Sequence, residues 1–198
     1  LKKRILTSFF LFLLVFMIYN YNFILIYSLI ILGILSIIEF NKIIKLIFKK
    51  NLKKILINFF FIIYIFLFCY LFLFFSNFIG LKIILYILLV GCIASDIGGF
   101  IFGKLFKGPK LTKISPNKTY SGSLGSIILA TFLISILFFF LINNLNIIIF
   151  LIGIMTSIFC QIGDLFFSYL KRKARIKDTG SFLPGHGGVL DRLDGILL

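Results

Sequence analysis

Long apolar stretches, separated by short clusters of lysine and arginine, constrain the fold of this 198-residue chain more than any other feature. A helix needs roughly 20 apolar residues to cross a bilayer, and backbone groups in lipid must be satisfied internally, which favours helices. Candidate membrane segments lie at about 5–19, 23–40, 55–75, 81–103, 124–142 and 147–170, and a seventh begins near residue 191. The sequence therefore predicts an all-α, polytopic membrane helix bundle with about six to seven membrane segments.

The net charge of +15 does not indicate nucleic-acid binding, because almost all of the cations lie in the connections between apolar segments. They cluster at residues 2–4, 42–54, 104–118 and 171–177. With a cytoplasmic amino terminus, twenty of the 21 cations lie on the cytoplasmic side and only Lys82 lies outside. This asymmetry follows the positive-inside rule and predicts a multi-pass protein of the inner or plasma membrane, with the basic loops and the active site in the cytoplasm.

The chain is expected to contain two functional regions. Residues 1–80 are predicted to form amino-terminal membrane helices, and residues 81–198 a catalytic membrane domain whose last helix is expected to be truncated. The first segment resembles a signal peptide, but no small-residue cleavage site follows it, so we expect it to be retained. The three cysteines lie singly in apolar segments, which is typical of small buried side chains and not of disulfides.

Four aspartates are predicted to lie at similar depths near the cytoplasmic side. Asp96 and Asp164 each precede the cytoplasmic end of their segment by about seven residues, roughly 10 Å along a helix, so they could face one aqueous pocket. Asp191 and Asp194 share a helix face through their i, i+3 spacing. Charged groups inside a membrane segment are usually functional. Clustered carboxylates suit Mg²⁺, which is commonly shared between one or two carboxylates and substrate phosphates.

The alternative is that each acidic residue pairs with a neighbouring cation or caps a helix. For Asp178, which lies beside Lys177 in a loop, the two interpretations are balanced. For Asp164, whose own segment contains no cation, a functional role is favoured. Glu39 lies three residues before Lys42 and is expected to form an ion pair with it at the membrane interface.

The segment 168–194 reads SYLKRKARIKDTGSFLPGHGGVLDRLD and combines cations, aspartates, glycines and the single histidine. Gly187 and Gly188 allow the backbone to approach a ligand closely, and successive backbone N–H groups can hold an anion. The start of the last helix also favours phosphate. His186 is open between a structural role and a substrate contact.

A second basic loop follows the segment that contains Asp96. Residues 98–104 spell G-x4-G-K, but Leu105 replaces the expected Ser or Thr and the motif ends an apolar helix, so we do not interpret it as a P-loop. The run Ser115-Pro-Asn-Lys-Thr-Tyr then carries polar side chains suited to a phosphate or a nucleotide.

The pattern S-x-L-K-R-x4-K-D-x-G-x2-L-P-x-H-G-G-V-x-D-R-L-D over residues 168–194 resembles the phosphatidate cytidylyltransferases, also called CDP-diacylglycerol synthases. Residues 115–120 resemble a second conserved region of that family, although Ser121 stands where a glutamate is expected. Asp96 also matches, whereas its surroundings differ from the family. The resemblance covers about residues 70–194.

The resemblance implies an Mg²⁺-dependent enzyme that transfers the cytidylyl group of CTP to phosphatidate and forms CDP-diacylglycerol and pyrophosphate for phospholipid synthesis. The catalytic residues that it implies are Asp164, Lys171, Arg172, Lys177, His186, Asp191 and Arg192. The expected substrate-binding residues are Ser115, Lys118, Thr119, Gly187 and Gly188. The expected metal ligands are Asp164, Asp191, Asp194 and Asp96.

Two other functions stay open, namely a membrane transporter or anion channel and a cytidylyltransferase that acts on a different lipid phosphate. Transporters also contain intramembrane aspartates and broken helices. They need polar groups near the midplane and at both exits, however, whereas the polar residues here gather on the cytoplasmic side. The expected partners are CTP, phosphatidate and the lipid bilayer, with no nucleic acid and with a homodimer left open.

Overall fold

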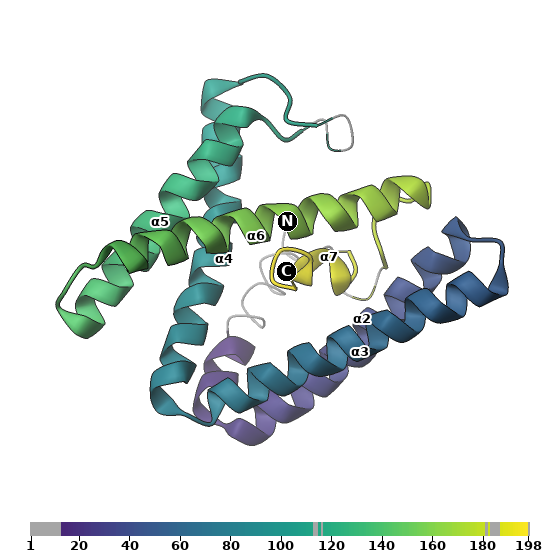
Figure 1. The fold of residues 1–198 in the computed structure, drawn as a ribbon, viewed down its shortest axis with the longest axis horizontal. Helices are drawn as coiled ribbons and strands as arrows, with labels where there is room; N and C mark the ends of the chain where they lie inside the picture. Colours follow the sequence, from purple (N-terminus) through teal and green to yellow (C-terminus); the bar gives the residue numbers. More distant parts are fainter. Residues whose placement is uncertain (1–12, 113–114, 116, 181, 183–186, 198) are drawn as a thin grey trace. The chain divides into compact units, whose positions relative to one another are not determined.

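The computed structural model describes residues 13–112, 115, 117–180, 182 and 187–197 (Figure 1). Within these residues, five helices are long and apolar enough to cross a membrane, and each contains one of the predicted segments. They are α2 (Asn22–Ile47), α3 (Asn51–Ser76), α4 (Ile79–Phe106), α5 (Tyr120–Ile142) and α6 (Ile147–Lys173). The structure confirms the predicted all-α, polytopic architecture, and the chain is a multi-pass membrane protein.

The first and last predicted segments are described only in part. Residues 13–20 are helical and end at a break at Tyr21, while the remainder of the segment 5–19 lies outside the described residues. At the other end of the chain, α7 (Leu190–Leu193) is a short helix that begins where the seventh segment was expected.

The chain divides into two compact units. Unit 1 comprises Leu1–Phe75 and Leu170–Leu193, and unit 2 comprises Ser76–Tyr169 and Asp194–Leu198. Unit 1 therefore holds α2, α3, the last turn of α6 and α7, and unit 2 holds α4, α5 and the rest of α6. The boundary near residue 75 lies close to the predicted one at 80, and the assignment of catalysis to residues 81–198 stays a prediction.

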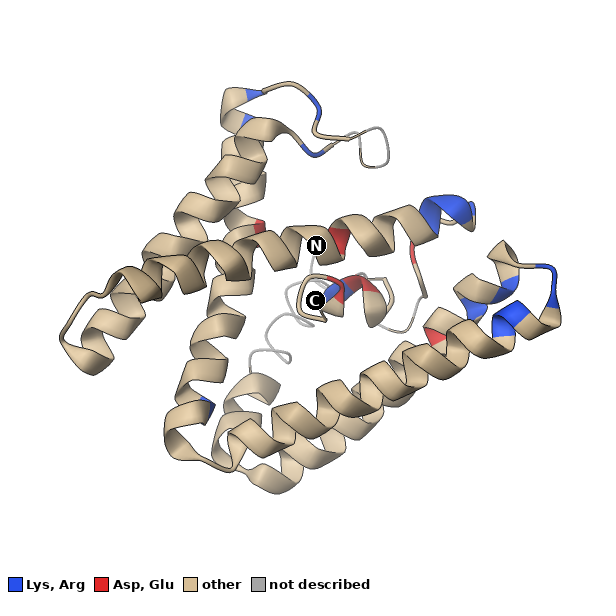
Figure 2. Ribbon diagram, in the orientation of Figure 1, with Lys and Arg blue, Asp and Glu red and all other residues tan. Residues whose placement is uncertain are grey.

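In unit 1, α2 and α3 form an antiparallel pair held by aromatic and amide contacts (Figure 1). The rings of Phe40 and Phe61 stack with centroids 3.7 Å apart, and Asn58 Nδ2 donates a hydrogen bond of 3.0 Å to Asn41 Oδ1. The Lys173 ammonium lies 5.5 Å from the centre of the Phe48 ring. The basic end of α6 therefore lies beside the lysine-rich connection between α2 and α3, and Figure 2 shows cations on both.

In unit 2, α4 and α5 lie side by side and approach closely at glycines (Figure 1). A Cβ added to Gly98 would lie 2.5 Å from the carbonyl oxygen of Gly125, so the two backbones nearly touch there. Small residues at helix contacts allow this close approach in membranes. Helix α6 joins the pair through a hydrogen bond of 2.9 Å between the buried hydroxyls of Ser95 and Ser157.

The connection between α4 and α5 is shaped by its two helix ends. Helix α4 ends at Lys107, which has a left-handed φ of 42° and is followed by Gly108 and Pro109, which cannot continue the helix. Helix α5 begins after Thr119, whose side chain accepts a hydrogen bond of 3.1 Å from Gly122 N, as a helix N-cap should. These two ends fix where the polar loop leaves and rejoins the helices.

The glycine contact between α4 and α5 predicts a large response to one added methyl group. Gly98→Ala should lower the free energy of unfolding by about 1–3 kcal/mol, because the new Cβ meets the Gly125 backbone, which cannot rotate away. Gly80→Ala is the matched control on the same helix, since a Cβ there meets nothing within 4 Å. Denaturant titration of the purified protein in detergent measures both, and equal stability of the two variants would contradict the proposed packing.

Candidate active site

A pocket of about 300 Å³ lies within unit 2, where α4, the α4–α5 connection, the start of α5 and α6 meet. Its charged lining residues are Asp96, Lys118 and Asp164. Its neutral polar lining residues are Ser115, Asn117, Thr119, Ser123, Ser126 and Gln161. Five of the predicted site residues therefore line one cavity, and they come from three parts of the sequence: Asp96 from α4, Asp164 from α6, and Ser115, Lys118 and Thr119 from the connection between α4 and α5. The predicted sharing of one pocket by Asp96 and Asp164 is confirmed.

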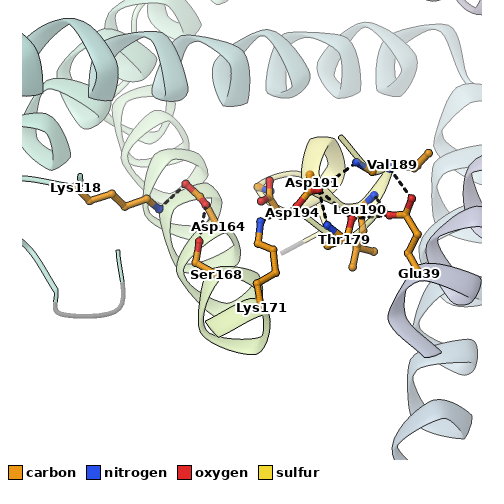
Figure 3. A network of polar contacts seen from close by, with 12 residues as sticks. Glu39, Lys118, Asp164, Ser168, Lys171, Thr179, Val189, Leu190, Asp191 and Asp194 are labelled. Atoms are coloured by element: carbon orange, nitrogen blue, oxygen red, sulfur yellow. Dashed lines mark hydrogen bonds and ion pairs between the residues drawn. The ribbon is translucent and has the colours of Figure 1, made fainter. Parts of the chain in front are cut away.

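Asp164 lies on α6, and each of its two carboxylate oxygens contacts a different side chain (Figure 3). Lys118 from the α4–α5 connection forms an ion pair with Asp164 Oδ2, and Ser168 Oγ donates a hydrogen bond of 3.3 Å to Asp164 Oδ1. The Asp164 side chain keeps 32% of its surface exposed, so it remains accessible from the pocket. The cation that pairs with Asp164 therefore comes from the α4–α5 connection and not from the segment 147–170, which contains no lysine or arginine.

Gln161 is a pocket residue that the sequence interpretation missed. Its amide accepts a hydrogen bond of 2.5 Å from Ser123 Oγ and donates one of 3.1 Å to Ser157 Oγ and one of 3.3 Å to the Ser123 carbonyl. It therefore links α5 to α6 directly beside the charged groups. Its position three residues before Asp164, on the same helix face, is the signal that could have identified it.

In unit 1, the carboxylate of Glu39 is buried and binds the segment that follows α6 (Figure 3). Thr179 Oγ1 donates to Glu39 Oε2 at 2.7 Å, Leu190 N donates to the same oxygen at 2.9 Å, and Val189 N donates to Oε1 at 3.0 Å. Among the described residues, none forms an ion pair with Glu39. The predicted interfacial ion pair with Lys42 is therefore wrong, because main-chain and hydroxyl donors satisfy this carboxylate instead.

Asp191 accepts several hydrogen bonds within the same segment. Lys171 Nζ pairs with Oδ1 at 2.7 Å, while Thr179 N and Gly188 N donate to Oδ2 at 2.8 and 3.1 Å. Burial disfavours the charged form, but the hydrogen bonds and charge of Lys171 and the two backbone donors outweigh it and hold the pKa of Asp191 below its ordinary value. Asp191 is therefore ionised at neutral pH and fixes the segment to the end of α6.

The glycines of this segment have two conformational roles in the structure. Gly187 has a φ of +83°, a conformation that residues with a Cβ rarely adopt. At Gly188 the backbone N–H donates to Asp191, and a Cβ would come within 2.5 Å of Glu39 Oε2. The expected contact of these glycines with a substrate phosphate stays a prediction, since protein carboxylates hold the N–H groups of residues 188–190 in this structure.

The remaining predicted catalytic and metal-binding residues that the structure describes do not line the pocket of unit 2. Arg172, Lys177 and Arg192 are exposed, Asp194 accepts a hydrogen bond of 3.0 Å from Gly195 N, and His186 lies outside the described residues. Across the described part of the chain, no three His, Cys, Asp or Glu side chains gather closely enough to hold a metal ion. The metal roles predicted for the aspartates therefore stay predictions.

Comparison with known proteins identifies a family that matches nearly the whole chain and relatives that match part of it. A family model described as the cytidylyltransferase family matches residues 2–198. A protein of Helicobacter pylori strain J99 named phosphatidate cytidylyltransferase is 44% identical over 110 residues, which are 56% of this chain and 41% of the relative. A protein of the same name from Staphylococcus haemolyticus is 46% identical over 120 residues, covering 60% of this chain and 46% of the relative.

A further protein with this name, from Rickettsia felis, is 45% identical over 123 residues, covering 57% of this chain and 54% of the relative. The chain thus spans about half the length of the curated relatives that it matches.

The amide network predicts a structural contribution from Gln161. Gln161→Met should reduce the free energy of unfolding by about 1 kcal/mol, because it removes the hydrogen bonds to Ser123 and Ser157 while nearly keeping the side-chain length. Ile162→Val, at the neighbouring exposed position, serves as the control and should have little effect. Denaturant titration in detergent distinguishes them, and an unchanged midpoint for Gln161→Met would show that the network adds no stability.

Proposed function

Because this chain belongs to the cytidylyltransferase family, we propose that the protein to which it belongs transfers the cytidylyl group of CTP to phosphatidate. The products are CDP-diacylglycerol and pyrophosphate, and the reaction supplies phospholipid synthesis. The observation that carries the proposal is the pocket of unit 2, in which two carboxylates, a lysine and several neutral oxygen donors surround about 300 Å³. The names of the relatives support the choice of substrates.

In the proposed reaction, an oxygen of the phosphatidate phosphate attacks the α-phosphorus of CTP. A new P–O bond forms, the bond between the α-phosphorus and the bridging oxygen breaks, and pyrophosphate leaves. A phosphate monoester is already anionic at neutral pH, so little is needed from a general base. Catalysis of such transfers depends mainly on positioning and on neutralising charge. Lys118 supplies a cation at the pocket, and a substrate phosphate would compete with Asp164 for it.

The donor set of the pocket fits a divalent cation that prefers oxygen ligands. Asp96 and Asp164 offer carboxylates, and Asn117 and Gln161 offer amide oxygens within the same lining; Mg²⁺ is usually held by one or two carboxylates together with substrate phosphates. When bound, Mg²⁺ would supply positive charge to the triphosphate. We propose Asp164 and Asp96 as the residues of unit 2 that hold it, and the metal roles of Asp191 and Asp194 remain predictions.

We also propose that the active site faces the cytoplasm of the inner or plasma membrane. CTP is a soluble nucleotide, and the cations of the chain concentrate in the connections that contain the pocket residues and the segment after α6. A basic cytoplasmic face attracts anionic lipid headgroups such as that of phosphatidate. The absence of nucleic acid among the partners and the formation of a homodimer remain predictions.

The activity is tested with the full-length protein in membranes, phosphatidate and labelled CTP. A labelled lipid should form with Mg²⁺ and should be lost without it. Asp164→Asn should lower the rate by at least about 100-fold, the scale of losing one preorganised charge contact. Asn144→Ala, which changes an exposed side chain of the α5–α6 connection that does not line the pocket, should retain most of the activity and is the control.

Several outcomes of this assay would contradict the proposal. If no labelled lipid forms and the protein moves an anion across liposomes, the chain belongs to a transporter. If label enters only a different lipid phosphate, such as a prenyl-ether phosphate, the reaction class holds and the lipid substrate is wrong. Near-normal rates in Asp164→Asn would show that its carboxylate is structural.

The proposed orientation predicts which positions an impermeant thiol reagent reaches. In a background without the three native cysteines, cysteine at Lys110 or Lys177, both exposed in the structure, should be labelled only after permeabilisation because both face the cytoplasm. Cysteine at Asn144, in the exposed connection between α5 and α6, should be labelled in intact cells. Labelling of Lys110→Cys or Lys177→Cys in intact cells would show that these positions face outward and that the proposed orientation is wrong.

A further inference from the structure

We propose that Glu39 is a positioning residue for the segment that follows α6, and that its carboxylate sets the conformation from which Asp191 is presented. The proposal rests on the proposed function for what this segment does in catalysis. Glu39 is the only acidic residue that precedes Asp96 in the chain, and it lies in an apolar helix. Its role therefore cannot be read from the motif of residues 168–194.

The hydrogen bonds of Glu39 connect α2 to both ends of this segment. Thr179, near its start, donates through its hydroxyl, and Val189 and Leu190, at its end, donate through backbone N–H groups. Glu39 is 4% exposed, so these donors take the place of the water molecules that would solvate an exposed carboxylate. An isolated buried carboxylate is strongly unfavourable, and Glu39 therefore retains its burial only while the segment keeps this conformation.

Two glycines leave the space that the carboxylate occupies. A Cβ at Gly180 would lie 2.6 Å from Glu39 Oε1, and one at Gly188 would lie 2.5 Å from Oε2. Real side chains do not approach an oxygen this closely, so both positions require glycine while Glu39 is in place. The structure gives these two motif glycines a shared function, which is to admit a carboxylate from another helix.

The Thr179 hydroxyl connects Glu39 to Asp191. It lies 2.7 Å from Glu39 Oε2 and 3.0 Å from Asp191 Oδ2, and its single hydrogen can be donated to one of them at a time. Thr179 N also donates to Asp191 Oδ2. Moving Glu39 would therefore release Thr179, and with it one of the groups that orients the Asp191 carboxylate.

The first test measures backbone hydrogen exchange in the full-length protein, over a peptide that contains residues 187–193. Glu39→Gln keeps the size of the side chain but replaces one of the two acceptor oxygens by an NH₂ group. At least one of the donors that contact Glu39 then loses its acceptor. Exchange at Val189 and Leu190 should accelerate by about tenfold or more, the scale of losing one buried hydrogen bond. Ser36→Ala is the matched control, since Ser36 is buried on α2 and has no hydrogen-bond partner among the described residues.

The second test separates positioning from stability in the cytidylyl-transfer assay. Glu39→Gln and Thr179→Val should each lower kcat by about tenfold or more, and the double variant should lose no more than the worse single variant, because both interrupt the same connection. Thr179→Ser restores a hydroxyl and should recover most of the rate. Thr179→Val also leaves both backbone contacts of Glu39 intact, so it tests the connection even if Glu39→Gln does not fold.

The two tests have separate failures. Unchanged exchange in Glu39→Gln, or the same acceleration in Ser36→Ala, would overturn the proposal. Additive losses of kcat would show that Glu39 and Thr179 act independently, and no rescue by Thr179→Ser would show that the hydroxyl is not needed; either result would also overturn the proposal. If the wild-type protein makes no CDP-lipid, the proposed function is wrong, and hydrogen exchange alone then decides whether Glu39 positions the segment.

Discussion

A charged group that is removed from water needs a partner within the protein, and in a chain as apolar as this one such partners are few. Transfer of an unpaired carboxylate into an apolar medium is strongly unfavourable, whereas a carboxylate with several donors can be tolerated. Glu39 meets this requirement with one hydroxyl and two backbone N–H groups, and Asp164 meets it with Lys118 and Ser168. The irregular segments of the chain adopt the conformations that supply these donors.

In unit 2, close packing of the helices determines where the partner of Asp164 lies. The contact of Gly98 with the Gly125 backbone brings α4 against α5, and Thr119 caps α5 at the point where the connection returns. Lys118, the residue before this cap, then reaches Asp164 on α6. Three helices therefore define the pocket, and a change at the glycine contact would displace the loop that carries its lysine.

The sequence predicted the helices well because the thickness of a bilayer sets their length and its apolar interior sets their composition. Their ends extend a few residues beyond the predicted segments, because caps such as Thr119 lie in polar sequence. The shared pocket of Asp96 and Asp164 could be predicted from their equal depths in two segments. The partners of Glu39 could not, because two of its three donors are backbone N–H groups of residues about 150 positions away, and such groups leave no signature in side-chain identity.

The occupied backbone donors also change how the glycine-rich motif can recognise phosphate. The sequence suggested that successive N–H groups at the start of the last helix would bind an anion, but Gly188 N serves Asp191, and the next two N–H groups serve Glu39. If the segment binds phosphate in this conformation, as we propose, its cationic side chains are the groups left to do so, and Arg172 and Lys177 are among those that are exposed. Replacing Gly188 by a residue with a Cβ would then disturb the packing around Glu39, even if no contact with phosphate is lost.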